Sequence, residues 1–311
     1  MRILFAGQSN AEFLDGTPQI AQFGQELGAQ VDFAAWGGSA LVRRNASRST
    51  PNNYWLEDDY SNGVRMRDTI SAMEPNDPYD YVIWVQGEQD ATRIRTAGQA
   101  DAYLSGLTVL SQKFLAHNPN MQFLVCRIGQ RLSADKDLGI SLVQGAQTEA
   151  ISRSNYIHLG ADYYDLDLLD SVHLSAKGRA ELLWRLSRNI RRLESGKCVM
   201  SEPYVVQATA RRANQSRILV ELGNVTKLYM GTSSLPLFKI LGSYDLQIQR
   251  RIKISSQTLQ LNLSGPVRGH QLAVAYGDYP DIDTSGGKQI RNEHLVPIRP
   301  QVIDIRVANW G

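Results

Sequence analysis

The chain has 311 residues, with 33 lysines and arginines against 31 aspartates and glutamates and a formal net charge of +2. This near balance predicts no strong attraction to nucleic acid or to an anionic membrane, and no stretch approaches the roughly 18 apolar residues of a membrane span. The first apolar run begins directly after Met1, which leaves no room for a signal peptide. We therefore expect a soluble protein, synthesised in the cytoplasm and long enough for two domains.

Up to about residue 195 the sequence alternates short apolar runs with segments of helical spacing. Strands are predicted at residues 2–6, 30–35, 79–85, 121–128 and 156–159. Helices are predicted at residues 17–27, 63–73, 97–117, 139–152 and 175–192. Residues 43–59 have no periodicity and favour an irregular loop, whose arginines are more typical of a solvated face than of a substrate contact. The alternation predicts a mostly parallel sheet with helices on both faces.

The character of the sequence changes near residue 198. From residue 204 onward it consists of short runs in which apolar and polar residues alternate, separated by Gly, Asn, Ser and Pro turns. No long segment there has helical spacing. Roughly six to eight short strands in about 110 residues are typical of a small antiparallel β-sandwich. We therefore predict two domains, residues 1–198 and residues 199–311.

Three of the predicted strands end in glycine-rich or polar turns, where α/β proteins usually bind their ligands. These turns are Gly7-Gln8-Ser9-Asn10, Trp36-Gly37-Gly38-Ser39 and Gln86-Gly87-Glu88-Gln89-Asp90. Ser9 is predicted at a strand-to-loop corner, with a hydroxyl that can point outward as a nucleophile. The alternative is that Ser9 and Asn10 only form a turn or cap the next helix.

A serine nucleophile needs a base and a group that orients the base. Of the five histidines, His173 has the right location, just after the last predicted strand and before the last helix. Asp170, three residues earlier, can reach back to the imidazole Nδ1 while Nε2 faces the serine. Asp162, Asp165 and Asp167 are rivals for the acid role. The alternative is a helix entry in which Asp170 caps and His173 packs.

The nucleophile also needs donors for the oxyanion that develops on the substrate. The backbone N–H of Ser9, that of Gly37 or Gly38, and the side-chain amide of Gln86 could converge on one point if the strand ends face one crevice. Glycine allows the backbone to approach a substrate without a Cβ in the way. The alternative is that the glycines are ordinary turn residues and Gln86 a polar strand end.

Together these segments resemble the four sequence blocks of the SGNH hydrolases. The matching blocks are Gly7-Gln8-Ser9-Asn10, Gly37-Gly38-Ser39, Gln86-Gly87-Glu88-Gln89-Asp90 and Asp170-Ser171-Val172-His173. The first and third blocks are similar to those of the sialate O-acetylesterase and acetylxylan esterase branch. The resemblance covers residues 2–195 and implies a three-layer α/β/α, flavodoxin-like domain, here followed by the small all-β sandwich domain.

The resemblance also implies roles for individual residues. Ser9 would be the nucleophile, His173 the base and then the acid, and Asp170 the residue that orients His173. The oxyanion hole would combine Ser9 with Gly37 and Gln86, although the superfamily usually has asparagine in the third block. Four further residues are expected to support the site: Gln8, Asn10, Glu88 and Asp90. A direct catalytic role for the carboxylate of Glu88 or Asp90 is the less favoured alternative.

The leading hypothesis is a carbohydrate O-acetylesterase that works through an acyl-enzyme, with an O-acetylated carbohydrate as its substrate and without metal or cofactor. Cys126 and Cys198 show neither metal nor redox spacing, so two free thiols are expected.

Two other readings stay open. One keeps the triad and changes the substrate to a lipid ester or thioester. The other is a glycan-binding or virion receptor-binding protein with weak or no esterase activity. Acetylated glycans are mostly extracellular, so the missing signal peptide would suit either a phage component released by lysis or an intracellular polysaccharide-degrading enzyme. The protein could assemble as a homo-oligomer or as part of a virion, and the sequence leaves both alternatives open.

Overall fold

The structure is a computed structural model, and it describes most of the first two hundred residues and the strands beyond them. The described residues are 1–73, 78–129, 137–164, 166–197, 204–210, 216–223, 238–241, 248–255, 257–267, 270–274 and 301–307. The contacts within the chain divide it into two compact units, Met1–Val199 and Met200–Gly311. The assignment of these units as an esterase domain and an accessory domain stays a prediction.

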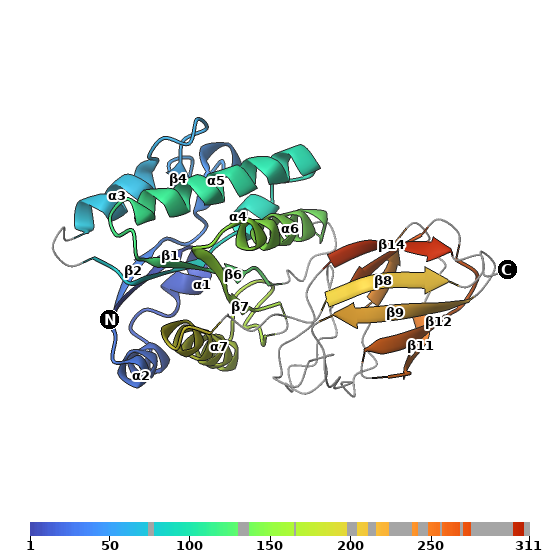
Figure 1. The fold of residues 1–311 in the computed structure, drawn as a ribbon. Helices are drawn as coiled ribbons and strands as arrows, with labels where there is room; N and C mark the ends of the chain where they lie inside the picture. Colours follow the sequence, from blue (N-terminus) through green and yellow to red (C-terminus); the bar gives the residue numbers. More distant parts are fainter. Residues whose placement is uncertain are drawn as a thin grey trace. The chain divides into compact units, whose positions relative to one another are not determined.

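The first unit is built on a five-stranded sheet in the order β2-β1-β5-β6-β7, with all neighbouring strands parallel (Figure 1). The strands are β1 (Arg2–Gly7), β2 (Gln30–Ala35), β5 (Tyr81–Val85), β6 (Gln122–Arg127) and β7 (Ile157–Asp162). In chain order this is the flavodoxin-like arrangement, in which the strand order reverses at β1. The predicted fold class of this unit is therefore confirmed.

Helices cover both faces of the sheet, with α2 and α7 together on one face and α3, α5 and α6 on the other (Figure 1). The helices are α1 (Ser9–Glu12), α2 (Pro18–Leu27), α3 (Val64–Ala72), α4 (Glu88–Ala91), α5 (Ala97–Leu115), α6 (Asp137–Arg153) and α7 (Ala176–Glu194). Thr17 and Ser175 cap α2 and α7 by accepting hydrogen bonds from backbone N–H groups of the first turn. None of the described helices has the length and apolar character of a membrane-spanning segment.

The central strand β5 is buried along its whole length, because both faces of the sheet are covered. This explains why the segment reads as a continuous apolar run rather than as an alternating one. Trp84 of β5 packs edge-on against Trp55, with ring centroids 5.0 Å apart, and both side chains are completely buried. The sheet is therefore a rigid support for the turns that follow its strands.

The segment predicted as an irregular loop contains short ordered elements. They are β3 (Ala40–Val42), the 3-10 helix η1 (Arg43–Asn45) and β4 (Tyr54–Leu56), and β3 pairs with β4 in parallel. Elements of three residues are too short to leave a periodic signal in the sequence. Arg43 and Arg44 form ion pairs with Glu57 and Asp58, in agreement with a solvated face.

The second unit has a seven-stranded sheet in the order β10-β13-β14-β8-β9-β12-β11 among the described residues. The strands are β8 (Tyr204–Ala210), β9 (Arg217–Gly223), β10 (Phe238–Leu241), β11 (Ile248–Lys253), β12 (Thr258–Leu263), β13 (Gln271–Val274) and β14 (Gln301–Val307). The small β domain is confirmed, but its sheet is mixed, because β14 and β8 pair in parallel. These strands lie at opposite ends of the unit's sequence, and so long a connection permits a parallel pair.

Cys126 is buried in β6 and is a free thiol. Cys198, expected to be a second free thiol, lies outside the described residues.

Candidate active site

The carboxyl ends of β2, β1 and β5 meet at one edge of the sheet. Gly7, the last residue of β1, pairs with Ala35 on one side and with Val85 on the other. The three turns that the sequence singled out are therefore neighbours. Gly7 has φ +138°, and a Cβ there would lie 2.2 Å from the carbonyl oxygen of Val85, so only glycine fits.

Ser9 is the first residue of α1, a four-residue helix that follows β1 after the single residue Gln8. The sequence predicted a strand-to-loop corner here, and one helical turn is too short to be recognised by periodicity. Ser9 is 7% exposed. Its backbone N–H donates to no acceptor among the described residues, as is usual for the first N–H groups of a helix. This N–H is available to a ligand.

His173 connects Ser9 with Asp170. Its Nε2 lies 3.0 Å from Ser9 Oγ, and its Nδ1 lies 2.7 Å from Asp170 Oδ2. The other carboxylate oxygen, Oδ1, accepts hydrogen bonds from the backbone N–H groups of Val172 and His173, both at 2.8 Å. The structure therefore brings Ser9, His173 and Asp170 into the hydrogen-bonded order that nucleophilic catalysis by serine requires.

The rival carboxylates are occupied elsewhere. Asp162 receives two hydrogen bonds from the buried Arg127, at 2.7 and 2.6 Å. Asp167 accepts the hydroxyl of Ser175 at 2.6 Å. Asp165 lies outside the described residues.

Asp170 has an unusually acidic side chain. Burial acts to raise its pKa, but the hydrogen bonds from the His173 ring and from the backbone of Val172 and His173 outweigh it and lower the pKa to about 2. An ionised carboxylate only accepts hydrogen bonds, so Nδ1 of His173 must carry a hydrogen. In the neutral imidazole, Nε2 then has a lone pair for the hydroxyl of Ser9.

Phe13 packs on the imidazole, a contact that the sequence analysis did not anticipate. The ring centroids of Phe13 and His173 are 4.8 Å apart with an interplanar angle of 51°, and Phe13 is 40% exposed. Phe13 directly follows α1, four residues after Ser9, so one turn of backbone separates the two. This spacing could have indicated a side chain beside Ser9, had the helix been recognised.

Asn10 holds the loop of His173 against α1. Its Oδ1 accepts the backbone N–H of Leu174 at 3.0 Å, and its Nδ2 donates to the carbonyl of Val172 at 3.2 Å. The same Nδ2 donates to Glu88 Oε1 at 2.8 Å. These contacts agree with the expected supporting role of Asn10.

Glu88 is buried beneath the site as the first residue of α4. Burial raises its pKa, against hydrogen bonds from the hydroxyl of Tyr163, at 2.6 Å, and from Asn10, which lower it. Its Oε2 has no hydrogen-bond partner within the described part of the chain. Glu88 contacts supporting residues rather than Ser9 or His173, which agrees with a structural role.

Gln8 joins the ends of two strands. Its side-chain Oε1 accepts the backbone N–H groups of Gly87 and Gln89, both at 3.3 Å, and it is almost completely buried. Gln8 thereby fixes the turn after β5 to the turn after β1.

Asp90 fixes β3 and η1 to α4. Its Oδ2 accepts the backbone N–H of Leu41 at 2.8 Å and the side-chain amide of Gln86, and its Oδ1 accepts Asn45 Nδ2 at 2.7 Å. Burial raises the pKa of Asp90 to about 6, against these three donors, which lower it. The carboxyl is therefore mostly ionised at neutral pH, which suits three partners that all donate.

Gln86 differs from the expectation. Both hydrogens of its side-chain amide are donated within the protein, one to the carbonyl of Ser39 at 3.0 Å and one to Asp90. Its Oε1 accepts the hydroxyl of Tyr103 at 3.2 Å, and the residue is completely buried. In this arrangement Gln86 has no donor to offer an oxyanion, because its longer side chain reaches Asp90 instead.

Gly37 lies close to Ser9. A Cβ on Gly37 would lie 3.9 Å from Ser9 Cβ and 2.9 Å from Oε2 of Glu12. The N–H groups of Gly37 and Gly38 donate to no acceptor among the described residues, and Gly38 has φ +68°. Of the expected oxyanion donors, the backbone groups of Ser9, Gly37 and Gly38 thus remain available.

Asn53 and Arg65 support the turn that contains Gly37, a role that was not predicted from the sequence. Asn53 Nδ2 donates to the carbonyl of Gly37 at 2.8 Å, and Arg65 Nε donates to Asn53 Oδ1 at 2.9 Å. The carbonyl of Gly37 belongs to the same peptide unit as the N–H of Gly38. A donor on that carbonyl polarises the peptide and makes its N–H a stronger donor.

Among the described residues, no group of three His, Cys, Asp or Glu side chains is placed to hold a metal ion.

No protein-family model matches the sequence, and no curated protein matches it. Among solved structures, the chain is similar to a carbohydrate acetylesterase from Xanthomonas citri, with a TM-score of 0.68 and 15% identity over 97% of this chain and 80% of the other. A family two carbohydrate esterase from Clostridium thermocellum, solved with cellohexaose, gives a TM-score of 0.45 at 15% identity over 63% and 64% of the two chains. The first likeness shows a shared fold, a parallel α/β unit followed by a β domain.

Proposed function

We propose that this protein is a carbohydrate O-acetylesterase that uses Ser9 as its nucleophile and needs no metal ion. The observation that carries the proposal is the chain of hydrogen bonds from Ser9 Oγ through His173 to the acidic side chain of Asp170. The shared fold with a carbohydrate acetylesterase supports the substrate class. The sialate O-acetylesterase branch stays a prediction.

The reaction begins when Ser9 Oγ attacks the acetyl carbonyl carbon and His173 Nε2 takes the hydroxyl proton. The carbonyl π electrons move to the oxygen, where the backbone N–H groups of Ser9 and of Gly37 or Gly38 stabilise the negative charge. His173 then gives its proton to the sugar oxygen as the bond to carbon breaks. The products of this half-reaction are the free sugar hydroxyl and acetyl-Ser9.

Water completes the cycle. His173 removes one proton from water as the water oxygen attacks the acetyl-Ser9 carbonyl, and it returns that proton to Ser9 Oγ as the bond from Oγ to the acetyl carbon breaks. Acetic acid leaves and ionises to acetate. Asp170 stays ionised throughout and stabilises the imidazolium that forms twice in each turnover.

Gln86 has a different part in this proposal from the one expected from the sequence. By holding Ser39 and Asp90 it fixes the turn after β2 to the turn after β5. It is a positioning residue for the oxyanion hole rather than one of its donors.

The test is release of the carboxylate product, acetate or octanoate, by the wild type, Ser9→Ala and a matched control, Ser105→Ala, which removes an exposed hydroxyl on α5. The substrates are an aryl acetate, the corresponding octanoate, acetylated xylan, acetylated glucomannan and O-acetylated sialic acid. We expect release by the wild type and the control from acetyl esters, with a loss of at least about 1,000-fold in Ser9→Ala. Equal rates in Ser9→Ala and wild type would refute the proposal, and a preference for octanoate would favour the lipid esterase reading.

A further inference from the structure

Glu12 brings a negative charge to the edge of the catalytic site. It is the last residue of α1, and its Oε2 lies 2.9 Å from the position that a Cβ on Gly37 would occupy. The same position is 3.9 Å from Ser9 Cβ, so the carboxylate and the nucleophile border one small volume. Glu12 is exposed, and a substrate can reach it from solvent.

The carboxylate of Glu12 has no partner among the described residues. It makes no hydrogen bond or ion pair within the part of the chain that the structure describes, whereas Asp170 and Arg65 each have partners. Asp170 is held by His173. Arg65 binds Asn53, forms an ion pair with Asp68 at 3.3 Å and places its guanidinium over Trp36.

We infer that Glu12 selects the alcohol part of the substrate: it accepts a hydrogen bond from a hydroxyl of an uncharged sugar and disfavours sugars that carry a carboxylate. This inference rests on the proposed esterase function and specifies its substrate class. An acetyl group has no hydrogen-bond donor, so a donor that reaches Glu12 must belong to the sugar. A carboxylate accepts such bonds strongly, because charge-assisted hydrogen bonds are about twice as strong as neutral ones.

The position of Glu12 gives a second reason to expect hydroxyl groups there. An unscreened carboxylate next to Gly37 would oppose the negative charge that develops on the oxyanion. Donors from the sugar distribute the charge of Glu12 and reduce that repulsion. A carboxylated sugar does the opposite, since it adds a second negative charge to the same volume.

The expected size of the effect follows from Coulomb's law. Two unit charges about 6 Å apart, at an effective dielectric constant of about 40 for a site open to solvent, change a relative rate by about tenfold. Salt screens such an interaction, so the discrimination should weaken at high ionic strength.

The experiment compares two substrates that differ only at C6 of the sugar. They are methyl 3-O-acetyl glucoside, which carries a hydroxymethyl group, and methyl 3-O-acetyl glucuronoside, which carries a carboxylate. The ratio of their kcat/KM values is measured at low ionic strength and in about 0.5 M salt. The proteins are the wild type, Ser9→Ala, Glu12→Gln, the charge-conserving Glu12→Asp, and Glu26→Gln as a control of equal charge change.

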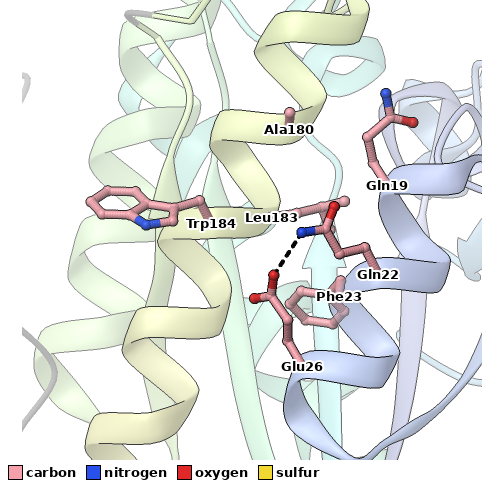
Figure 2. Close-up of a pocket in the computed structure, with 7 residues that line it drawn as sticks. All are labelled: Gln19, Gln22, Phe23, Glu26, Ala180, Leu183 and Trp184. Carbon is pink, nitrogen blue, oxygen red and sulfur yellow. Dashed lines mark hydrogen bonds between the residues drawn. The ribbon is translucent and has the colours of Figure 1, made fainter.

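Glu26 is a suitable control because it is remote from the site. It lies near the end of α2, before β2 begins, at the opposite edge of the sheet from Ser9. It borders the groove between α2 and α7 and accepts a hydrogen bond from Gln22 Nε2 at 2.8 Å (Figure 2).

We expect Glu12→Gln to reduce the preference for the glucoside about tenfold, with the glucuronoside gaining and the glucoside losing mainly through KM. Glu12→Asp and Glu26→Gln should keep most of the preference, and salt should weaken it in the wild type. An unchanged ratio of kcat/KM values in Glu12→Gln, or an equal change in Glu26→Gln, overturns the inference. If release still depends on Ser9, the esterase proposal stays intact. Release independent of Ser9 overturns both.

Discussion

The side chain of Asn10 accepts a hydrogen bond from the backbone N–H of Leu174 at 3.0 Å, which joins α1 to the residue directly after His173. Because Asn10 follows Ser9 and Leu174 follows His173, this one hydrogen bond helps to set the distance between Ser9 and His173. Its Nδ2 also donates to the carbonyl of Val172, on the other side of His173. The geometry of the pair thus depends on a residue that itself contacts neither reacting atom.

Replacing Asn10 by alanine should misplace His173. Near-attack geometry is sensitive to shifts of about 1 Å, so we expect kcat for an aryl acetate to fall by about 10- to 100-fold with a smaller change in KM. The buried partners left without hydrogen bonds should cost about 1–3 kcal/mol of unfolding free energy. Steady-state kinetics and chemical denaturation measure the two effects. A variant with normal kcat would show that Asn10 supports only the fold.

Replacing Asp170 by asparagine should abolish most of the activity. An asparagine amide can donate to Nδ1 and favour the wrong tautomer, with the hydrogen on Nε2, so that His173 cannot accept the proton of Ser9. We expect kcat to fall by about 1,000-fold or more. Asp167→Asn, which changes a nearby carboxylate that instead accepts from Ser175, is the control and should lose far less. Equal losses in the two variants would contradict the assignment of Asp170.

The low pKa of Asp170 also predicts a pH dependence of stability. The folded pKa of about 2 lies below the ordinary value of 3.8, so the ionised carboxylate stabilises the folded state. That contribution is fully present above about pH 4 and is lost as the pH falls toward 2. The difference in unfolding free energy between the wild type and Asp170→Asn should therefore shrink over this window. A difference that stays constant would mean that the carboxylate is not held by His173.

The strands and their parallel sheet could be predicted from the residues, and the flavodoxin-like order was implied only by the resemblance. The finer parts of the site could not be predicted. Apolar runs such as Tyr81–Val85 identify buried parallel strands directly, and Asp170 precedes His173 closely enough for a local argument. The helices α1 and α4 are single turns without a periodic signal, so the positions of Glu12 and Phe13 near Ser9 and His173 were missed.

The support behind Gly37 shows a different limit of sequence reasoning. Asn53 contacts Gly37, and Arg65 contacts Asn53, across 16 and 12 residues of sequence. Tertiary packing decides such contacts. Adjacent asparagines in a loop carry no sign of it.

Asn53→Ala should weaken the oxyanion hole. It removes the donor to the carbonyl of Gly37, so the peptide that offers the N–H of Gly38 becomes less polarised and less fixed. We expect kcat to fall by about tenfold with little change in KM. Arg65→Gln should give a smaller decrease in the same direction, because Arg65 acts through Asn53. If Arg65→Gln lowered kcat by more than Asn53→Ala, Arg65 would have to act by a route other than Asn53, such as its contact with Trp36.

Gln86→Ala distinguishes the two roles considered for Gln86. An oxyanion donor would give a loss on the order of 100-fold in kcat at nearly unchanged stability. The contacts in this structure predict the reverse: a large loss of stability and a small loss of kcat. The variant removes a hydrogen-bond donor from the buried carboxylate of Asp90 and from the carbonyl of Ser39. We expect a loss of about 2–4 kcal/mol of unfolding free energy. At a temperature where the variant is folded, kcat should stay within about tenfold of the wild type.

A double-mutant cycle completes this test. Asp90→Ala removes the partner of Gln86, so the stability losses of the two single variants should overlap strongly in the double variant, with a coupling of about 1–3 kcal/mol. Additive losses would mean that the hydrogen bond between Gln86 and Asp90 contributes little. Together with a 100-fold loss of kcat in Gln86→Ala, additivity would show that the amide turns toward the substrate during turnover, and Gln86 would then be the oxyanion donor that its place in the sequence indicates.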